Sequence, residues 1–266
     1  MRFLLFPGIL LFSCSAFADW KIADNSPAQD PESPLIYERK QVSRNGENGF
    51  FSSKRIDLIW FHSSTHTFRV IDNGPANSPK YSDIATAMKR NHCIAGTNGG
   101  FFLKNHAPSG LMIANGSSTG KFGQGSLLSG VVLSSGNRNP YVLRRAEFGE
   151  NYKPTDLLQA GPFLVDRGVQ VRGLSPENSR RRSFILHDGG DWFGLGLSDS
   201  FTLAELGEIL AHKHFSPTRK IQRALNLDGG TSSGFFVERG GRTEPIHVEP
   251  FKTVRNYLGI TKRESE

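Results

Sequence analysis

The sequence is poor in cysteine: its 266 residues include only 2, Cys14 and Cys93. Cys14 lies in an N-terminal apolar stretch that we expect to be removed. Only Cys93 would then remain, which excludes an internal disulfide bond in the mature chain. Cys93 lies in an apolar run, where a free cysteine is usually a small buried hydrophobic side chain. The fold is therefore expected to depend on an ordinary hydrophobic core.

The sequence also lacks an apolar run of the ~20 residues that a membrane-spanning helix needs. Residues 3–12 are apolar but shorter, follow Arg2 and precede Ala16-Phe17-Ala18. A charged start, an apolar stretch and an A-x-A site are typical of a secretory signal peptide. We expect residues 1–18 to be cleaved off and the protein to be secreted, with the periplasm as its predicted location. The alternative is lipidation at Cys14, which the bulky Phe12 disfavours.

A zinc-finger spacing and an RNP-like aromatic stripe are both missing, so we expect no nucleic acid partner. The chain has 32 Lys and Arg against 25 Asp and Glu, a formal charge of +7. A basic balance suits acidic partners such as phosphates, anionic polymers or a membrane surface. The basic residues are scattered, apart from Arg180-Arg181-Arg182. The sequence carries no signal of an oligomeric state.

Short β-rich runs separated by turn signals dominate the rest of the chain. Three hairpins are predicted, pairing residues 56–61 with 67–71, 163–165 with 169–171, and 183–186 with 192–197. Further strands are expected at residues 35–42, 94–97, 127–133, 141–144, 224–227 and 235–238.

Helical patterns are few. One covers residues 82–90, and another begins at Thr202, which forms a possible capping box with Glu205. These elements predict a single-domain α+β fold with a mainly antiparallel or mixed β-sheet and a few packed helices. Residues 19–49 read as an extended N-terminal lead-in, and residues 50–262 as the domain itself.

Two polar loops that follow apolar strands are the strongest candidates for chemistry. The first begins Asn98-Gly99-Gly100, and the second covers residues 226–233 (Asn-Leu-Asp-Gly-Gly-Thr-Ser-Ser). Paired glycines let a ligand approach the backbone closely, and successive amides form anion sites. The loops also supply amides, hydroxyls and a carboxylate, which suit a sugar with an attached phosphate; these residues are Asn98, Asn226, Asp228, Thr231, Ser232 and Ser233. The same residue types also make ordinary turns.

The sequence also allows two interpretations of Arg182. It is either a solvated member of the basic run or a bidentate phosphate clamp leading into a strand.

The order of these segments resembles the phosphodiester glycosidase family. The matching segments are residues 98–102 (Asn-Gly-Gly-Phe-Phe), Gln159 with 161–165 (Gly-Pro-Phe-Leu-Val), Arg182-Ser183, 202–206 (Thr-Leu-Ala-Glu-Leu), 226–233 and, loosely, Arg255-Asn256. The chain departs from the pattern at Ser183-Phe184, where Thr-Ala is common, and at Thr231, where Gly or Ser is common. The best-known activity of the family removes N-acetylglucosamine from the covered mannose-phosphate tag of lysosomal enzymes.

The resemblance implies a hydrolase acting on a phosphate-linked glycan or a small glycosyl phosphodiester. It implies that Asp228 and Arg182 are catalytic: Asp228 activates water or stabilises the sugar cation, and Arg182 holds the phosphate. The expected substrate-binding residues are Asn98, Gly99, Gly100, Gln159, Asn226, Gly229, Gly230, Thr231, Ser232 and Ser233. A second carboxylate is open among Glu147, Asp166, Asp188 and Asp191.

Other roles stay open at this point. Asn226 and Asp228 offer oxygen ligands that Ca²⁺ or Mg²⁺ prefer, although no cofactor is required by the sequence. The His residues at positions 62, 66, 212 and 214 read as structural or solvated. The alternative functions are a hydrolase of another glycosidic or phosphodiester bond, and a non-catalytic carbohydrate-binding or envelope-assembly protein.

Overall fold

The computed structural model describes residues 20–29, 33–44, 53–135, 138–240 and 243–263. The expected signal peptide and Cys14 lie outside the described residues. Within them, no helix has the length and apolar character that a membrane crossing requires.

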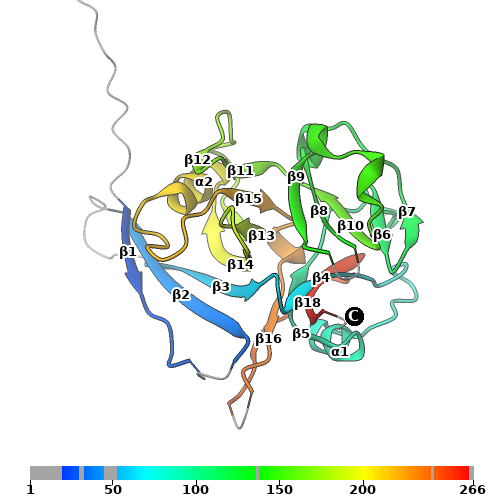
Figure 1. The fold of residues 1–266 in the computed structure, drawn as a ribbon, viewed down its shortest axis with the longest axis horizontal. Coiled ribbons are helices and arrows are strands. Elements are labelled where there is room, and N and C mark those ends of the chain that lie inside the picture. The colour runs from blue at the N-terminus through cyan, green and yellow to red at the C-terminus, as the bar shows by residue number, and fades with distance from the viewer. Residues whose placement is uncertain (1–19, 30–32, 45–52, 136–137, 241–242, 264–266) are drawn as a thin grey trace, which may run out of the picture.

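The described chain folds into three antiparallel sheets (Figure 1). The first has eight strands in the order β1-β2-β3-β14-β13-β15-β11-β12. Its strands are β1 (Trp20–Asp24), β2 (Leu35–Arg44), β3 (Lys54–His62), β11 (Phe163–Asp166), β12 (Val169–Gln170), β13 (Arg180–His187), β14 (Trp192–Phe201) and β15 (Arg223–Asn226).

The other two sheets have five strands each. The second has the order β17-β16-β5-β18-β4 and the third β7-β6-β10-β8-β9. The strands of the second sheet are β4 (His66–Asp72), β5 (Cys93–Asn98), β16 (Phe235–Val237), β17 (Ile246–Val248) and β18 (Asn256–Lys262). Those of the third are β6 (Met112–Ala114), β7 (Ser117–Thr119), β8 (Gly130–Ser134), β9 (Tyr141–Arg144) and β10 (Asp156–Ala160).

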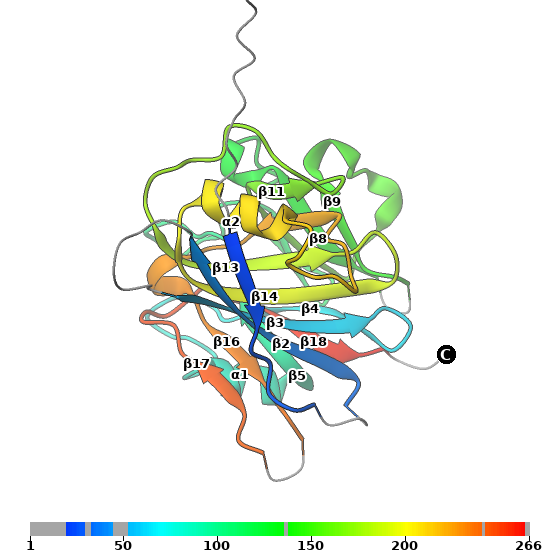
Figure 2. The same ribbon diagram turned by 90° about the vertical axis from the view of Figure 1, so that its left-hand side faces the viewer.

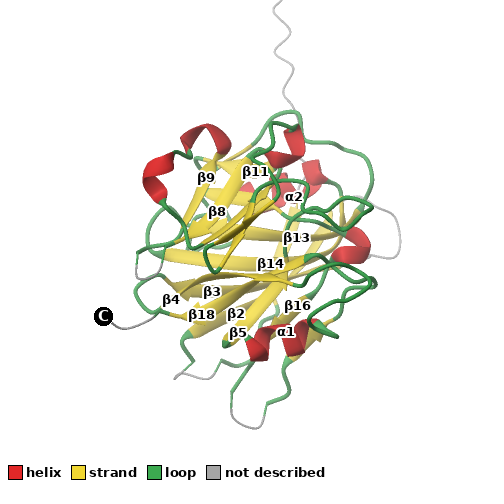
Figure 3. Cartoon of the chain, turned by 90° about the vertical axis from the view of Figure 1, so that its right-hand side faces the viewer, coloured by secondary structure: helices red, strands yellow, loops and turns green. Residues whose placement is uncertain are grey.

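Helices are few and peripheral (Figure 3). The described residues contain only two α-helices, α1 (Ile84–Arg90) of 7 residues and α2 (Leu203–Ala211) of 9 residues. Four single turns of 3₁₀ helix complete the set: η1 (Ser126–Leu128), η2 (Arg145–Glu147), η3 (Glu150–Tyr152) and η4 (Gly230–Ser232). The mainly antiparallel sheet structure is confirmed. The α+β class is corrected to a β-dominated fold, because short apolar runs of strand length outnumber the helical patterns.

The core has a central part between the sheets and outer parts beneath the helices. The central part includes Phe61, Phe68, Phe163 and Phe235, which come from strands of both the first and the second sheet. The outer face of the first sheet is covered by α2 (Figure 2).

The outer face of the second sheet is covered by α1. Met88 of this helix packs with the buried Cys93. Burial raises the pKa of the Cys93 thiol to about 12, so the cysteine is an inert core side chain, as the sequence predicts.

The hairpin predicted between residues 56–61 and 67–71 is wrong. The two runs form β3 and β4, but β3 pairs with β2 and β14, whereas β4 pairs with β18. The turn between them carries the chain from one sheet to another. Its Ser63 amide donates to the Asp191 carbonyl at 2.8 Å, and its Thr65 carbonyl accepts from the Arg263 amide at 2.9 Å.

The other two predicted hairpins, β11–β12 and β13–β14, are confirmed. The β11–β12 turn has Arg167 and Gly168 at positive φ (52° and 76°), as a tight hairpin requires. The strand expected at residues 127–133 begins only at Gly130, because Leu127 lies in η1.

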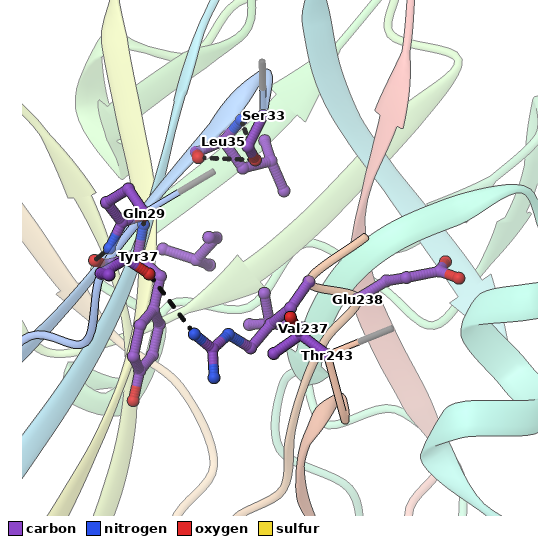
Figure 4. Close-up of a pocket in the computed structure, with 10 residues that line it drawn as sticks. Gln29, Ser33, Leu35, Tyr37, Val237, Glu238 and Thr243 are labelled. Atoms are coloured by element: carbon purple, nitrogen blue, oxygen red, sulfur yellow. Dashed lines mark hydrogen bonds between the residues drawn. The ribbon is translucent and has the colours of Figure 1, made fainter. Parts of the chain in front are cut away.

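The expected strand at residues 35–42 is β2, and it is continuous with the first sheet. Leu35 and Tyr37 are buried, and the Tyr37 amide donates to Gln29 Oε1 at 3.1 Å. The Tyr37 hydroxyl also donates to Asp57 Oδ1 at 2.6 Å. A small pocket of about 50 Å³ lies where this segment meets the end of β16 at Val237 (Figure 4).

The predicted capping box of α2 is formed and carries a testable consequence. Glu205 donates its amide to Thr202 Oγ1 at 3.1 Å and accepts the Thr202 amide at 2.9 Å. Because Thr202→Ala removes this cap, we expect the free energy of unfolding to fall by about 1 kcal/mol in chemical denaturation. Thr253→Ala, at an exposed position, is the matched control. Equal stability of both variants would show that the cap contributes nothing.

Candidate active site

Asn98, the last residue of β5, ties three segments together from a fully buried position. Its Oδ1 accepts a hydrogen bond from the Ser183 hydroxyl at 2.6 Å and from the Gly234 amide at 3.1 Å. Its Nδ2 donates to the Asp228 carbonyl at 2.7 Å. The side chain thus joins β5 of the second sheet to β13 of the first and to the loop after β15.

The two candidate loops meet at this junction. The Asp228 amide donates to the Gly99 carbonyl at 3.1 Å, so the loops also bond directly through their backbones. They are 130 residues apart in the chain. The two loops, which are far apart in the sequence, therefore form one structural unit.

Gly99 and Gly100 are held from the other side by Asn256. The Gly99 amide donates to the Asn256 carbonyl at 2.9 Å, and the Gly100 amide donates to Asn256 Oδ1 at 2.8 Å. A Cβ atom on Gly99 would lie 1.9 Å from that Oδ1, so glycine is required here by close approach. These two amides, expected to face a phosphate, are used within the protein.

Gln159 and Asn226 also make internal hydrogen bonds. Gln159 is buried; its Nε2 donates to the Gly123 carbonyl at 2.7 Å and its Oε1 accepts from the Gly123 amide at 2.8 Å. Asn226 Nδ2 donates to the carbonyls of Gly161 and Leu227 at 2.9 and 2.7 Å. Both side chains therefore have structural partners within the protein.

A pocket of about 430 Å³ opens beside Asp228. Its described lining consists of Arg180, Arg181, Ser200, Asp228, Gly229, Gly230, Thr231, Phe251 and Lys252. Four residues expected from the sequence are among them: Asp228, Gly229, Gly230 and Thr231. Asn98, Gly99, Gly100, Gln159, Asn226, Arg182, Ser232 and Ser233 are not part of this lining.

Asp228 is the only carboxylic acid among the described residues of this lining. Burial raises the pKa of the Asp228 carboxyl above its ordinary value of 3.8. This rise is opposed by the nearby Ser232 hydroxyl, by Lys252, by the Gly229 amide and by Arg180, each of which lowers the pKa. The Gly229 amide donates to Asp228 Oδ1 at 2.9 Å and fixes the orientation of the carboxyl group. The result is a half-buried acid whose ionisation is tuned by cations, a combination typical of catalytic groups.

Gly230 is the one glycine of these loops with a left-handed backbone, at φ +64°. It begins the 3₁₀ turn η4, which buries the side chains of Ser232 and Ser233 completely. The amides of Gly230 and Thr231 donate no hydrogen bond within the described part of the chain. They remain available to an anion in the pocket.

Arg182 lies behind the pocket wall. Its Nε donates to the Phe201 carbonyl at 3.1 Å, and its Nη2 donates to the Asn178 carbonyl at 2.7 Å. Burial, together with repulsion from Arg180, lowers the pKa of the Arg182 guanidinium. Its side chain passes beneath Gly229, where a Cβ atom would lie 3.6 Å from Arg182 Cδ. The neighbours Arg180 and Arg181 line the pocket instead.

Phe251 and Lys252 are pocket residues that sequence reasoning missed. They follow β17 in a loop that the Phe251 amide ties to the Thr231 carbonyl at 2.8 Å. The Phe251 ring is 78% exposed. An aromatic residue beside a lysine in a polar segment is only a weak sequence signal of a binding site. No neighbouring motif in the sequence links these two residues to the Asp228 loop.

The four open candidates for a second carboxylate lie elsewhere, towards the opposite ends of the β13 and β15 strands. Glu147 pairs with Arg223 at 2.6 Å, and Asp166 pairs with Arg144 at 2.9 Å. Asp188 accepts the Gly190 amide at 2.8 Å within a turn, and Asp191 accepts from the Ser63 hydroxyl at 3.3 Å. Each of these carboxylates has a structural partner, and none lines the Asp228 pocket.

A divalent cation does not fit the pocket well. Within the described ranges, no three His, Cys, Asp or Glu side chains gather as metal ligands. Ca²⁺ and Mg²⁺ need several oxygen ligands, whereas Asp228 is surrounded by Arg180, Arg181 and Lys252. His62, His66, His212 and His214 are outside this lining. The arrangement suits an anion.

A larger pocket of about 520 Å³ lies at the other end of these strands. Its described lining includes His187 and Arg223 but no carboxylate. The His187 ring stacks on Phe193 at 4.3 Å, and burial lowers its pKa. Size alone would favour this pocket, but only the smaller one has a carboxylic acid, Asp228, in its described lining.

The position of Asn98 predicts a large effect of its removal. Asn98→Ala leaves the buried Ser183 hydroxyl and Gly234 amide without their acceptor, at about 1–3 kcal/mol for each unsatisfied group. We expect a loss of about 2–4 kcal/mol in the free energy of unfolding, measured by urea denaturation. Asn151→Ala, at an exposed position, is the control. A variant of Asn98 as stable as that control would contradict the role of this side chain as a structural tie.

Comparison with known structures finds proteins of similar fold. The fold is similar to the zebrafish N-acetylglucosamine-1-phosphodiester alpha-N-acetylglucosaminidase catalytic domain auto-inhibited by its pro-peptide, with a TM-score of 0.63 and 14% sequence identity over 92% of this chain and 88% of that one. It is also similar to a hypothetical protein from Synechocystis, with a TM-score of 0.54 and 15% identity over 93% of this chain and 68% of that one.

No curated protein sequence matches this chain. The family model described as phosphodiester glycosidase matches residues 91–261, which is more than half of the chain and includes β5, the Asp228 loop and most of β18. The chain belongs to the phosphodiester glycosidase family.

Proposed function

We propose that this protein is an exported hydrolase that releases a sugar from a glycosyl-1-phosphodiester. The observation that carries the proposal is the half-buried Asp228 carboxyl in a pocket lined by cations. A carboxylate supplies the base that a hydrolysis needs, and the cations match the charge of a phosphate. Family membership supports the same reaction class.

The scissile phosphate would bind between Arg180 and Lys252, with the free amides of Gly230 and Thr231 as further donors. These groups stabilise the negative charge that grows on the phosphate oxygen as the bond to the sugar breaks. Arg182 contributes by holding the β13 segment to the carbonyls of Phe201 and Asn178. Its role in catalysis itself is still a prediction.

Asp228 would act as the general base. It takes a proton from water while the water oxygen bonds to the anomeric carbon, and the electron pair of the carbon–oxygen bond leaves with the phosphate. A raised pKa makes the Asp228 carboxylate a stronger base. A phosphate is a good leaving group, so the second carboxylate of ordinary glycosidases is not needed here.

The identity of the sugar and the cellular location of the protein are two further parts of this proposal, and each is supported by a different observation. N-acetylglucosamine is the first sugar to test, because the zebrafish protein of similar fold is named for that substrate. Export is proposed from the charged start, apolar stretch and A-x-A site of residues 1–18. The periplasm is the proposed destination.

The direct test is sugar release from α-N-acetylglucosamine-1-phospho-methylmannoside by purified residues 19–266. We expect turnover by the wild type and a loss of at least about 100-fold in kcat for Asp228→Asn, because the amide cannot accept the proton. In ¹⁸O-labelled water the label should appear on the sugar.

The controls separate the alternatives. Asp191→Asn removes a carboxylate outside the pocket lining and should retain activity. Label on the phosphate would identify a phosphodiesterase that cleaves the P–O bond. Sugar binding without release by any variant would identify a carbohydrate-binding protein.

The electrostatics of Asp228 predict the pH dependence. The active base is the carboxylate, so kcat/KM should fall as pH drops below the raised pKa of Asp228. Lys252 lowers that pKa; Lys252→Met removes its charge and should move the acid limb of the profile to higher pH. Lys220→Met, at an exposed position outside the pocket, is the control. An acid limb that stays in place would show that Asp228 is not the group being titrated.

A further inference from the structure

The pocket carries more positive charge than a phosphodiester can neutralise. Arg180, Arg181 and Lys252 line it, and Asp228 is its only described acid. A phosphodiester bears a single negative charge, so at least one cation would face the bound substrate without a counterion.

Several of the described basic residues that hold the fold have acidic partners. Arg39 pairs with Asp57 at 2.8 Å, Arg223 with Glu147 at 2.6 Å, and Arg255 with Asp72 at 3.0 Å. By contrast, Arg180, Arg181 and Lys252 form no ion pair within the described chain. Cations that outnumber the acids beside them repel one another, and an anionic ligand relieves that repulsion.

Arg181 is the best placed of the three to bind a second anion. Its guanidinium lies 4.5 Å from the centre of the Phe251 ring, and its Nη2 is buried with no hydrogen-bond acceptor among the described residues. A buried donor without an acceptor is costly unless a ligand supplies one. The Phe251 backbone is fixed to Thr231, so the ring supports the guanidinium at the pocket wall.

The other two cations have different supports. Lys252 Nζ lies 4.7 Å from the centre of the Phe102 ring. Arg180 passes beside Gly230, where a Cβ atom would lie 3.6 Å from its Cδ. Arg181 and Phe251 are thus the cation–aromatic pair of this lining that is not assigned to the scissile phosphate.

We propose that the Arg181–Phe251 pair binds a second phosphate in the part of the substrate that leaves with the scissile phosphate. The natural substrate is then a glycosyl phosphodiester with a phosphorylated aglycone, either a diphosphate or a chain with a second phosphate further along. This inference rests on the proposed function for its link to turnover, but the anion subsite can be tested by binding alone.

The binding test compares ethyl phosphate with ethane-1,2-diyl bisphosphate, measured by isothermal titration calorimetry on the wild type. Each extra phosphate contact contributes a charge-assisted hydrogen bond. We expect the bisphosphate to bind at least about 10-fold more tightly, which corresponds to ~1.4 kcal/mol. Arg181→Gln should remove that preference, while Arg172→Gln, at an exposed position outside the pocket lining, should keep it. Equal affinity of the wild type for both probes, or an unchanged preference in Arg181→Gln, would overturn the proposal.

The turnover test uses three N-acetylglucosamine-1-phosphodiesters that share the sugar and the scissile bond. Their aglycones are methyl, 2-phosphoethyl, and a phosphate linked directly to form a diphosphate. Higher kcat/KM for one phosphorylated substrate, lost in Arg181→Gln, would support the subsite and show which spacing it takes. Faster or equal cleavage of the methyl ester would overturn it. No release from any of the three would refute the proposed function, and the calorimetry would still decide the subsite.

Discussion

The buried amide of Asn98 is the constraint on which the candidate site depends. It accepts hydrogen bonds from Ser183 and Gly234 and donates to the Asp228 carbonyl, so one side chain joins two sheets to the Asp228 loop. The Ser183 hydroxyl and the Gly234 amide are buried, and each would be left unsatisfied if the Asn98 amide moved. The position of the Asp228 carboxyl is therefore set by the packing of the sheets, not by the loop alone.

The residues that carry the family resemblance and those that line the pocket are largely different. The side chains of Asn98, Gln159 and Asn226 make their hydrogen bonds within the protein, and the amides of Gly99 and Gly100 donate to Asn256. The cationic wall comes from Arg180, Arg181 and Lys252. A scaffold that holds one acid in place can thus keep its chemistry while the wall adapts to another substrate.

The features that could be predicted from the sequence are those determined by residues close to one another in the chain. The capping box of α2 and the β11–β12 turn at Arg167-Gly168 formed as expected, because the determining residues are neighbours in the chain. The hairpin at residues 56–71 failed because β3 and β4 pair with strands more than 100 residues away, β14 and β18. Phe251 and Lys252 were missed for a similar reason: contacts with segments distant in the chain, such as the hydrogen bond from the Phe251 amide to Thr231, bring them to Asp228.

The cations and the acid of the pocket act on one another. Burial alone would raise the pKa of Asp228 and favour its protonated form, which cannot take a proton from water; Lys252 and Arg180 oppose this shift and favour the carboxylate. On the proposed mechanism, a bound phosphate neutralises part of that positive charge, so the pKa of Asp228 rises and its carboxylate becomes a stronger base when substrate is present. Binding and basicity are then linked through the same residues, and a second phosphate would strengthen the link.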